Sequence, residues 1–294
     1  MNRVTVKVPQ QGVVREGVGI VTMNHLGSSI HEDTGRDAQA LADRFRVLTI
    51  AADRPVSLHR KEMAAALATD AVSATMNIAS AIDHIADTHD LKTLLLAGRS
   101  AAGLSILELA LTEGISNARL VYAAEPVGSY ALSAAAGKAR FAAYQVEQKA
   151  LLAADDALEA RTLVHPNDDA RNLPLPARLK RMAAMVPLFL RDRALNTEHW
   201  AKALVPDYLT KIASAGLPAR VEFAEHSLVL PDAAAERQQT LEDMLATAAN
   251  SNGLLVVETV PGTTHASFDN RDFFGDRLQA ASAPHDFIIP PPEF

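Results

Sequence analysis

The stretch LLLAGRSAAG, residues 94–103, decides the expected fold because it carries a buried strand into a helix through one sharp turn. Four apolar residues precede Gly98, Ser100 follows two residues later, and small residues lead into a helical pattern. The turn has two interpretations. Ser100 is either an ordinary helix cap or the apex of a strained turn that lifts its hydroxyl above the sheet edge. Glycine and serine are common in turns of every kind, so the surrounding sequence must decide.

Short apolar runs alternate with amphipathic helical patterns along the chain, which is typical of a mostly parallel sheet flanked by helices. The runs predicted as strands are residues 4–8, 19–23, 46–51, 93–97, 119–124, 220–224 and 254–260. Residues 129–216 instead show helical patterns without a convincing strand, over a length too great for a simple loop. We therefore expect an α/β core formed by residues 1–128 and 217–294, with an all-helical cap inserted at residues 129–216.

Composition excludes several classes of function. The chain has 294 residues, enough for one large α/β domain, and a formal net charge of −7, which argues against a nucleic-acid partner. It has no cysteine, which excludes disulfides, thiolate metal sites and cysteine nucleophiles. The first residues lack the apolar segment of a signal peptide, and no apolar run is long enough for a membrane helix. We expect a soluble, cytoplasmic protein with no membrane partner.

Three segments at predicted strand ends occur in an order that resembles the α/β-hydrolase fold superfamily. GIVTMNHLGSS, residues 19–29, looks like the HG-X-G loop of that superfamily, and the strand and Asp-X-Pro turn in residues 44–55 follow it. LLLAGRSAAG is similar to the nucleophile elbow, and VPGTTHASFDNRDFF, residues 260–274, to the loop and last helix around the catalytic base. The elbow alone is a weak signal, but three elements in the right order are a stronger one.

This resemblance implies roles for particular residues. Ser100 would be the nucleophile and His265 the base that activates it, because a serine hydroxyl needs a base within hydrogen-bond reach. Backbone N–H groups of Ala101 and Leu26 would stabilise the oxyanion. His25 stands where the superfamily has glycine, so its ring either crowds the loop or reaches the substrate.

The acid that would orient the base is the open question. In most of the superfamily an aspartate follows the strand predicted here at residues 220–224, but Ser227 occupies that place, flanked by Glu225 and Asp232. The other known location is the end of the preceding strand, where this sequence has Glu125. Certain lactone hydrolases use a glutamate there. We expect Glu125 to be the acid, with Glu225 as second choice; alternatively, Glu125 caps a helix or forms a salt bridge.

These features favour a serine-dependent enzyme that hydrolyses a small or medium hydrophobic ester, lactone or thioester. No phosphate-binding loop or dinucleotide fingerprint occurs, and on a helix His84 and His89 face different directions, so we expect neither cofactor nor metal. A second hypothesis is a non-catalytic binding protein with the same fold. A third is acyl transfer to or from an acidic carrier protein or CoA. The basic residues that would receive such a partner are Arg178, Lys180, Arg181, Arg191 and Arg193.

Overall fold

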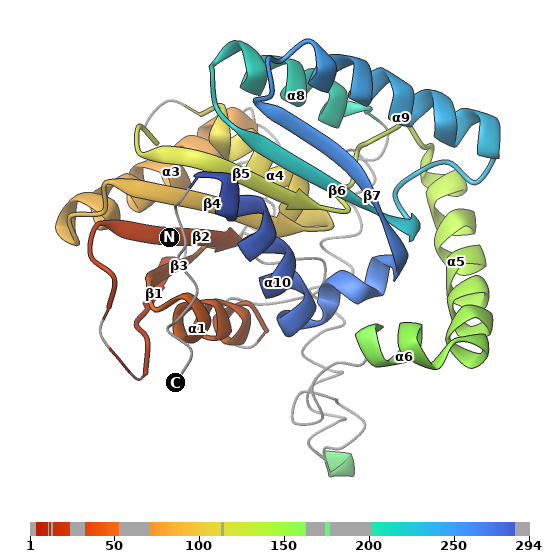
Figure 1. The fold of residues 1–294 in the computed structure, drawn as a ribbon, viewed down its shortest axis with the longest axis horizontal. Helices are drawn as coiled ribbons and strands as arrows, with labels where there is room; N and C mark the ends of the chain where they lie inside the picture. The colour runs from red at the N-terminus through yellow and green to blue at the C-terminus, as the bar shows by residue number, and fades with distance from the viewer. Residues whose placement is uncertain are drawn as a thin grey trace.

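The fold is built on one central sheet of seven strands (Figure 1). The computed structural model describes residues 4–10, 12, 14–23, 33–52, 71–112, 115–162, 174–176 and 202–285. The strands are β1 (Val4–Lys7), β2 (Val18–Met23), β3 (Leu48–Ala52), β4 (Thr93–Arg99), β5 (Ala118–Ala124), β6 (Ala219–His226) and β7 (Leu255–Thr264). Their order across the sheet is β1-β3-β2-β4-β5-β6-β7. Among the pairings of these described strands, only β1–β3 is antiparallel. The mostly parallel sheet and its predicted strands are confirmed.

Helices cover both faces of the sheet, which explains why the central strands read as nearly continuous apolar runs. The helices packed on one face are α3 (Ala71–Thr88), α4 (Ala101–Ala110), α8 (Leu204–Ser214) and α9 (Ala234–Ala249). Those on the opposite face are α1 (Asp33–Phe45) and α10 (Arg271–Ser282). Successive strand residues alternate between the two cores, as side chains of a strand must.

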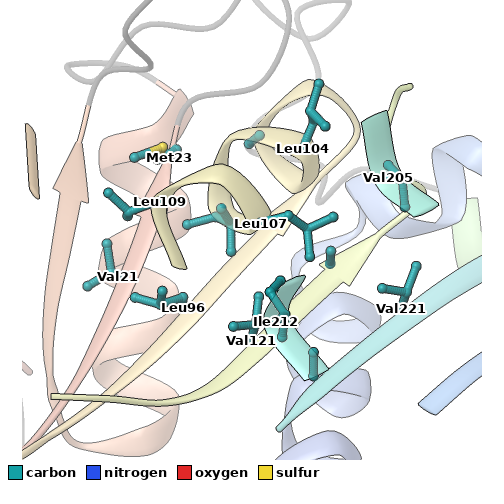
Figure 2. Close-up of a cluster of buried hydrophobic side chains, with 14 of the residues drawn as sticks. Val21, Met23, Leu96, Leu104, Leu107, Leu109, Val121, Val205, Ile212 and Val221 are labelled. Atoms are coloured by element: carbon teal, nitrogen blue, oxygen red, sulfur yellow. The ribbon is translucent and has the colours of Figure 1, made fainter. Parts of the chain in front are cut away.

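The first core is the larger of the two and fixes the position of α4 on the sheet. Figure 2 shows Leu107 of α4 and Ile212 of α8 gathered on this face beside Val121 of β5. Each of these three side chains is fully buried. Because α4 follows β4 directly, this packing also holds the turn at Ser100 in place.

The predicted insertion contributes helices to two different places. Its described helices are α5 (Ala134–Ala154), α6 (Asp156–Thr162) and α8. Helix α8 packs with α4 and α9 in the layer that covers the sheet, whereas α5 and α6 lie beyond the carboxyl ends of β5, β6 and β7 (Figure 1). Residues 24–32, 163–173 and 177–201 lie outside the described part. The division into a core and an all-helical cap therefore stays a prediction.

Within the described residues, no helix combines the length and the apolar character needed to cross a membrane.

Candidate active site

The turn at Ser100 is strained in the way that the second interpretation requires. Strand β4 ends at Arg99, helix α4 begins at Ala101, and Ser100 between them has φ 53° and ψ −127°. Non-glycine residues adopt such angles rarely, at a cost of about 1–3 kcal/mol. The Ser100 N–H donates to the Ala124 carbonyl at 2.8 Å, which ties the turn to β5. The Ser100 side chain makes no capping hydrogen bond to α4, so it does not act as an ordinary cap.

Two glycines allow α4 to start this close to the sheet. A Cβ atom on Gly98 would lie 2.7 Å from the Ala102 carbonyl oxygen and 2.8 Å from Cγ1 of Ile106. One on Gly103 would lie 3.2 Å from the Cα atom of Pro126. The small residues around Ser100 in the sequence are therefore a packing requirement of the turn.

Glu125 occupies the equivalent position on the neighbouring strand. Arg99 and Ala124 pair in the β4–β5 register, so Ser100 and Glu125 both come directly after paired strand ends. Glu125 also has a positive φ, 50°, and its side chain is fully buried. A buried carboxylate needs hydrogen-bond donors. The Ala224 N–H donates to Oε1 at 2.6 Å, and the Ser227 hydroxyl donates to Oε2 at 3.0 Å.

His265 brings its ring to the same carboxylate from the end of β7. It is the first residue of a short 3-10 helix, η3 (His265–Asp269), which a reciprocal capping box between Thr264 and Ser267 holds in place. The imidazole Nδ1 lies 2.8 Å from Glu125 Oε2, and the His265 side chain is 13% exposed. Because a carboxylate only accepts, Nδ1 carries the proton in this contact, and Nε2 is the nitrogen left to accept one.

The other acidic residues of this region have different partners. Glu225 accepts from the Gly262 N–H at 2.8 Å through Oε2. Asp232 forms an ion pair with Arg140 at 2.6 Å. Among these acids, the structure brings Glu125 into contact with His265, while the catalytic roles stay a prediction.

Ala101, a predicted oxyanion donor, is the first residue of α4. The first N–H groups of a helix have no intrahelical acceptor and lie at the positive end of its dipole, and the Ala101 N–H is one of these groups. The other predicted oxyanion donor, Leu26, and the neighbouring His25 lie outside the described residues. So do the basic residues predicted to receive an acidic partner, Arg178, Lys180, Arg181, Arg191 and Arg193.

Arg99, next to Ser100 in the sequence, forms ion pairs with two acids from different elements. Its guanidinium lies 3.1 Å from Asp37 of α1 and 3.0 Å from Asp269 of η3. Arg271 at the start of α10 binds the same Asp37 at 2.6 Å. These ion pairs join the strand that carries Ser100 to the turn that carries His265. A cavity of about 100 Å³ lies beside them, partly lined by Thr22 at the end of β2.

Sequence reasoning did not assign two further residues that the structure places at the site. The Ser227 hydroxyl donates to Glu125, and the ring of Tyr144 from α5 lies edge-on to the imidazole of His265, with 6.2 Å between ring centroids. The only sequence signal for Ser227 was its place where an aspartate is usual. Tyr144 lies in an alanine-rich helical segment, and no motif singles it out.

The described part of the chain holds no group of three or more histidine or acidic residues arranged to bind a metal ion.

Comparisons with known proteins give matches in structure alone. No protein-family model and no curated protein matches the sequence. The chain is similar to a proline iminopeptidase of Mycobacterium smegmatis, with a TM-score of 0.54, 15% identity and coverage of 96% of each chain. It is similar to an enol-lactonase of Burkholderia xenovorans LB400, with a TM-score of 0.54, 14% identity and 96% coverage of each chain. MGS-M2, an α/β-hydrolase enzyme from a Medee basin deep-sea metagenome library, matches with a TM-score of 0.51 and 13% identity, covering 96% of this chain and 94% of its own.

The strand order, the helices on both faces and these matches show that the chain has the α/β-hydrolase fold, as the sequence predicted.

Proposed function

We propose that this protein is a serine-dependent acyl-transfer enzyme that hydrolyses a small or medium hydrophobic ester, lactone or thioester. The observation that carries the proposal is the 2.8 Å contact between His265 Nδ1 and the buried carboxylate of Glu125. It occurs at the sheet edge where the strained turn presents Ser100. This combination supplies a nucleophile, a base and an acid that orients the base.

In the proposed reaction, Ser100 Oγ attacks the substrate carbonyl carbon while its proton passes to His265 Nε2. Glu125 stabilises the imidazolium that forms, and the Ala101 N–H, with that of Leu26, binds the oxyanion. The tetrahedral intermediate then breaks its bond to the leaving group, which takes the proton from His265. Water attacks the resulting acyl-Ser100 by the same steps in reverse roles, which releases the acid and restores the serine.

Water is the favoured acyl acceptor because two of the structural neighbours are named for hydrolytic activities, an enol-lactonase and an iminopeptidase. The same names favour catalysis over the alternative of a binding protein that merely shares the fold. Acyl transfer to a carrier protein or CoA depends on the predicted basic cluster, which lies outside the described residues. It stays a prediction without structural support.

Active-site labelling with a fluorophosphonate, read by intact mass, tests the nucleophile. We expect one adduct on the wild type and none on Ser100→Ala, whose turnover of short- and medium-chain p-nitrophenyl esters should fall by about 10⁶. Ser105→Ala is a matched control, since this buried serine lies one turn further along α4 and binds the Ala101 carbonyl. Full labelling of Ser100→Ala would refute the assignment.

A further inference from the structure

Helix α5 contacts His265, and the serine that binds Glu125, through an unusual set of buried residues. Among the α5 positions whose burial is described, only Gly137, Arg140 and Tyr144 are buried. They share one side of the helix, since residues three and four apart lie on the same face. A helix that only needed to pack would bury aliphatic side chains there. This one buries two large side chains with hydrogen-bonding groups.

Tyr144 touches the histidine side of the pair in two ways. Its ring meets the His265 ring edge-on at an interplanar angle of 85°, and its hydroxyl accepts the Ala266 N–H at 3.3 Å. The aromatic contact restricts rotation of the imidazole, and the hydrogen bond holds the turn that carries it. Burial raises the pKa of the Tyr144 hydroxyl, so this group stays neutral beside the site.

Arg140, one turn earlier, reaches the glutamate side through Ser227. Its guanidinium donates to the Ser227 carbonyl oxygen, and the hydroxyl of the same serine donates to Glu125 Oε2. Only 4% of the Arg140 side chain is exposed. Its charge is paired with Asp232 at 2.6 Å. The guanidinium is therefore fixed, and with it the segment that presents the serine hydroxyl to Glu125.

We propose that Arg140 and Tyr144 are positioning residues that hold Glu125 and His265 in the geometry needed for base catalysis, so that the placement of α5 sets the reactivity of Ser100. The catalytic meaning of this inference rests on the proposed function, but the positioning itself does not. Neither side chain is required to touch the substrate. Each acts on a neighbour of the reacting atoms, and a displacement of about 1 Å there is enough to cost about 10²-fold in rate.

Proton NMR of protein labelled with ¹⁵N-histidine tests the positioning without any substrate. The wild type should show a downfield Nδ1–H signal of His265, identified by its loss in His265→Asn. We expect Tyr144→Leu to broaden or remove the signal, because the ring and the Ala266 contact are both lost, and Tyr144→Phe to shift it less. Tyr208→Leu, which removes a partly buried tyrosine of α8, should leave it unchanged. An unchanged signal in Tyr144→Leu would overturn the proposal for Tyr144.

Kinetics then connect the positioning to catalysis. Tyr144→Leu should lower kcat by about 10²-fold with little change in KM, because it misplaces the base without altering ground-state binding. Tyr208→Leu, the same substitution at a partly buried tyrosine of α8, should keep kcat within a few-fold of wild type. A rise in KM at unchanged kcat would show that Tyr144 binds substrate instead, and would contradict a positioning role.

A double-mutant cycle tests the path from Arg140. If Arg140 acts through the Ser227 hydroxyl, then Arg140→Met combined with Ser227→Ala should be no slower in phosphonate labelling than Ser227→Ala alone. If the two substitutions reduce the labelling rate by independent factors that multiply in the double variant, Arg140 does not act through the Ser227 hydroxyl. The experiments distinguish failure of the proposed catalytic function from failure of the proposed positioning role. Absent labelling of Ser100 in the wild type removes the catalytic function, whereas normal labelling with an unchanged His265 signal in Tyr144→Leu removes only the positioning role.

Discussion

Glu222 in β6 and Glu125, directly after the neighbouring strand β5, are both fully buried, yet their carboxylates have different partners. Glu222 in β6 binds two permanent cations. The Arg277 guanidinium contacts both of its oxygens, at 2.8 and 2.6 Å, and Arg220 donates at 2.7 Å. The Tyr122 hydroxyl donates at 2.9 Å, and burial followed by the Glu222 charge raises the pKa of Tyr122, which keeps that donor protonated.

Among the described residues, no arginine or lysine contacts the carboxylate of Glu125. Its described partners are the Ala224 N–H, the Ser227 hydroxyl and the imidazole of His265. Two of them are always neutral, and the third changes charge when it takes up a proton. Within the described part of the chain, Glu125 therefore pairs with two neutral hydrogen-bond donors and one imidazole, whereas Glu222 pairs with two guanidinium groups.

This difference matches the two roles that we propose, a structural one for the carboxylate of Glu222 and a catalytic one for that of Glu125. A buried charge is costly unless it is paired, and pairing with arginine fixes the arrangement at every step of a reaction. Glu222 therefore anchors α10 to the sheet. In the reaction that we propose, Glu125 stabilises a charge that appears only when His265 takes a proton, as the orienting acid of a serine hydrolase does.

Among these substitutions, Glu125→Gln is expected to have the largest effect on turnover. The amide keeps the size of the side chain but presents a neutral group to His265, which loses both its orientation and the stabilisation of the imidazolium. We expect Glu125→Gln to lower kcat on a chromogenic ester by about 10⁴. The measurement is steady-state turnover, with circular dichroism to verify the fold. Turnover within tenfold of wild type would contradict the role assigned to Glu125.

Exchanging Glu222 for Gln should lower the stability of the protein and leave its turnover nearly unchanged. It leaves Arg277 and Arg220 with one fewer buried partner, so we expect the free energy of unfolding to fall by about 3 kcal/mol. Urea denaturation monitored by fluorescence and circular dichroism measures this loss. Turnover at a temperature where the variant is folded should stay within a few-fold of wild type. A loss of turnover comparable to that of Glu125→Gln, in a folded variant, would break the distinction between the two glutamates.

The smallest effect is expected at Glu225, the second choice for the acid. Its side chain is exposed at the end of β6 and accepts a backbone N–H from Gly262. The amide oxygen of Glu225→Gln can still accept that bond, so turnover should change by less than about threefold. The same ester assay measures it. A large loss here would move the acid to the end of β6.

The fold and the Glu125–His265 contact were accessible from sequence because both follow from strand ends. Parallel strands bring their carboxyl ends to one edge, so residues placed directly after β4, β5 and β7 converge whatever lies between them. The glycines at 98 and 103 also indicated that α4 begins close to the sheet, because this close approach depends on residues within the turn itself.

The supporting contacts were not accessible because they depend on how distant segments pack. Glu222 and Arg277 are 55 residues apart, and Tyr144 and Ala266 are 122 residues apart, with no periodic pattern linking either pair. The hydrogen bond from Ser227 to Glu125 depends on the path of the chain after β6. Residue type alone could not show that a serine there would serve a glutamate elsewhere.

The rate at which a fluorophosphonate labels Ser100 tests the central claim most directly, because it reports activation of the nucleophile without substrate binding or product release. The second-order rate constant should be compared between wild type, Glu125→Gln and Glu222→Gln under conditions where all are folded. We expect a fall of about 10³-fold or more for Glu125→Gln and a value within a few-fold of wild type for Glu222→Gln. Equal labelling rates for the two variants would contradict it.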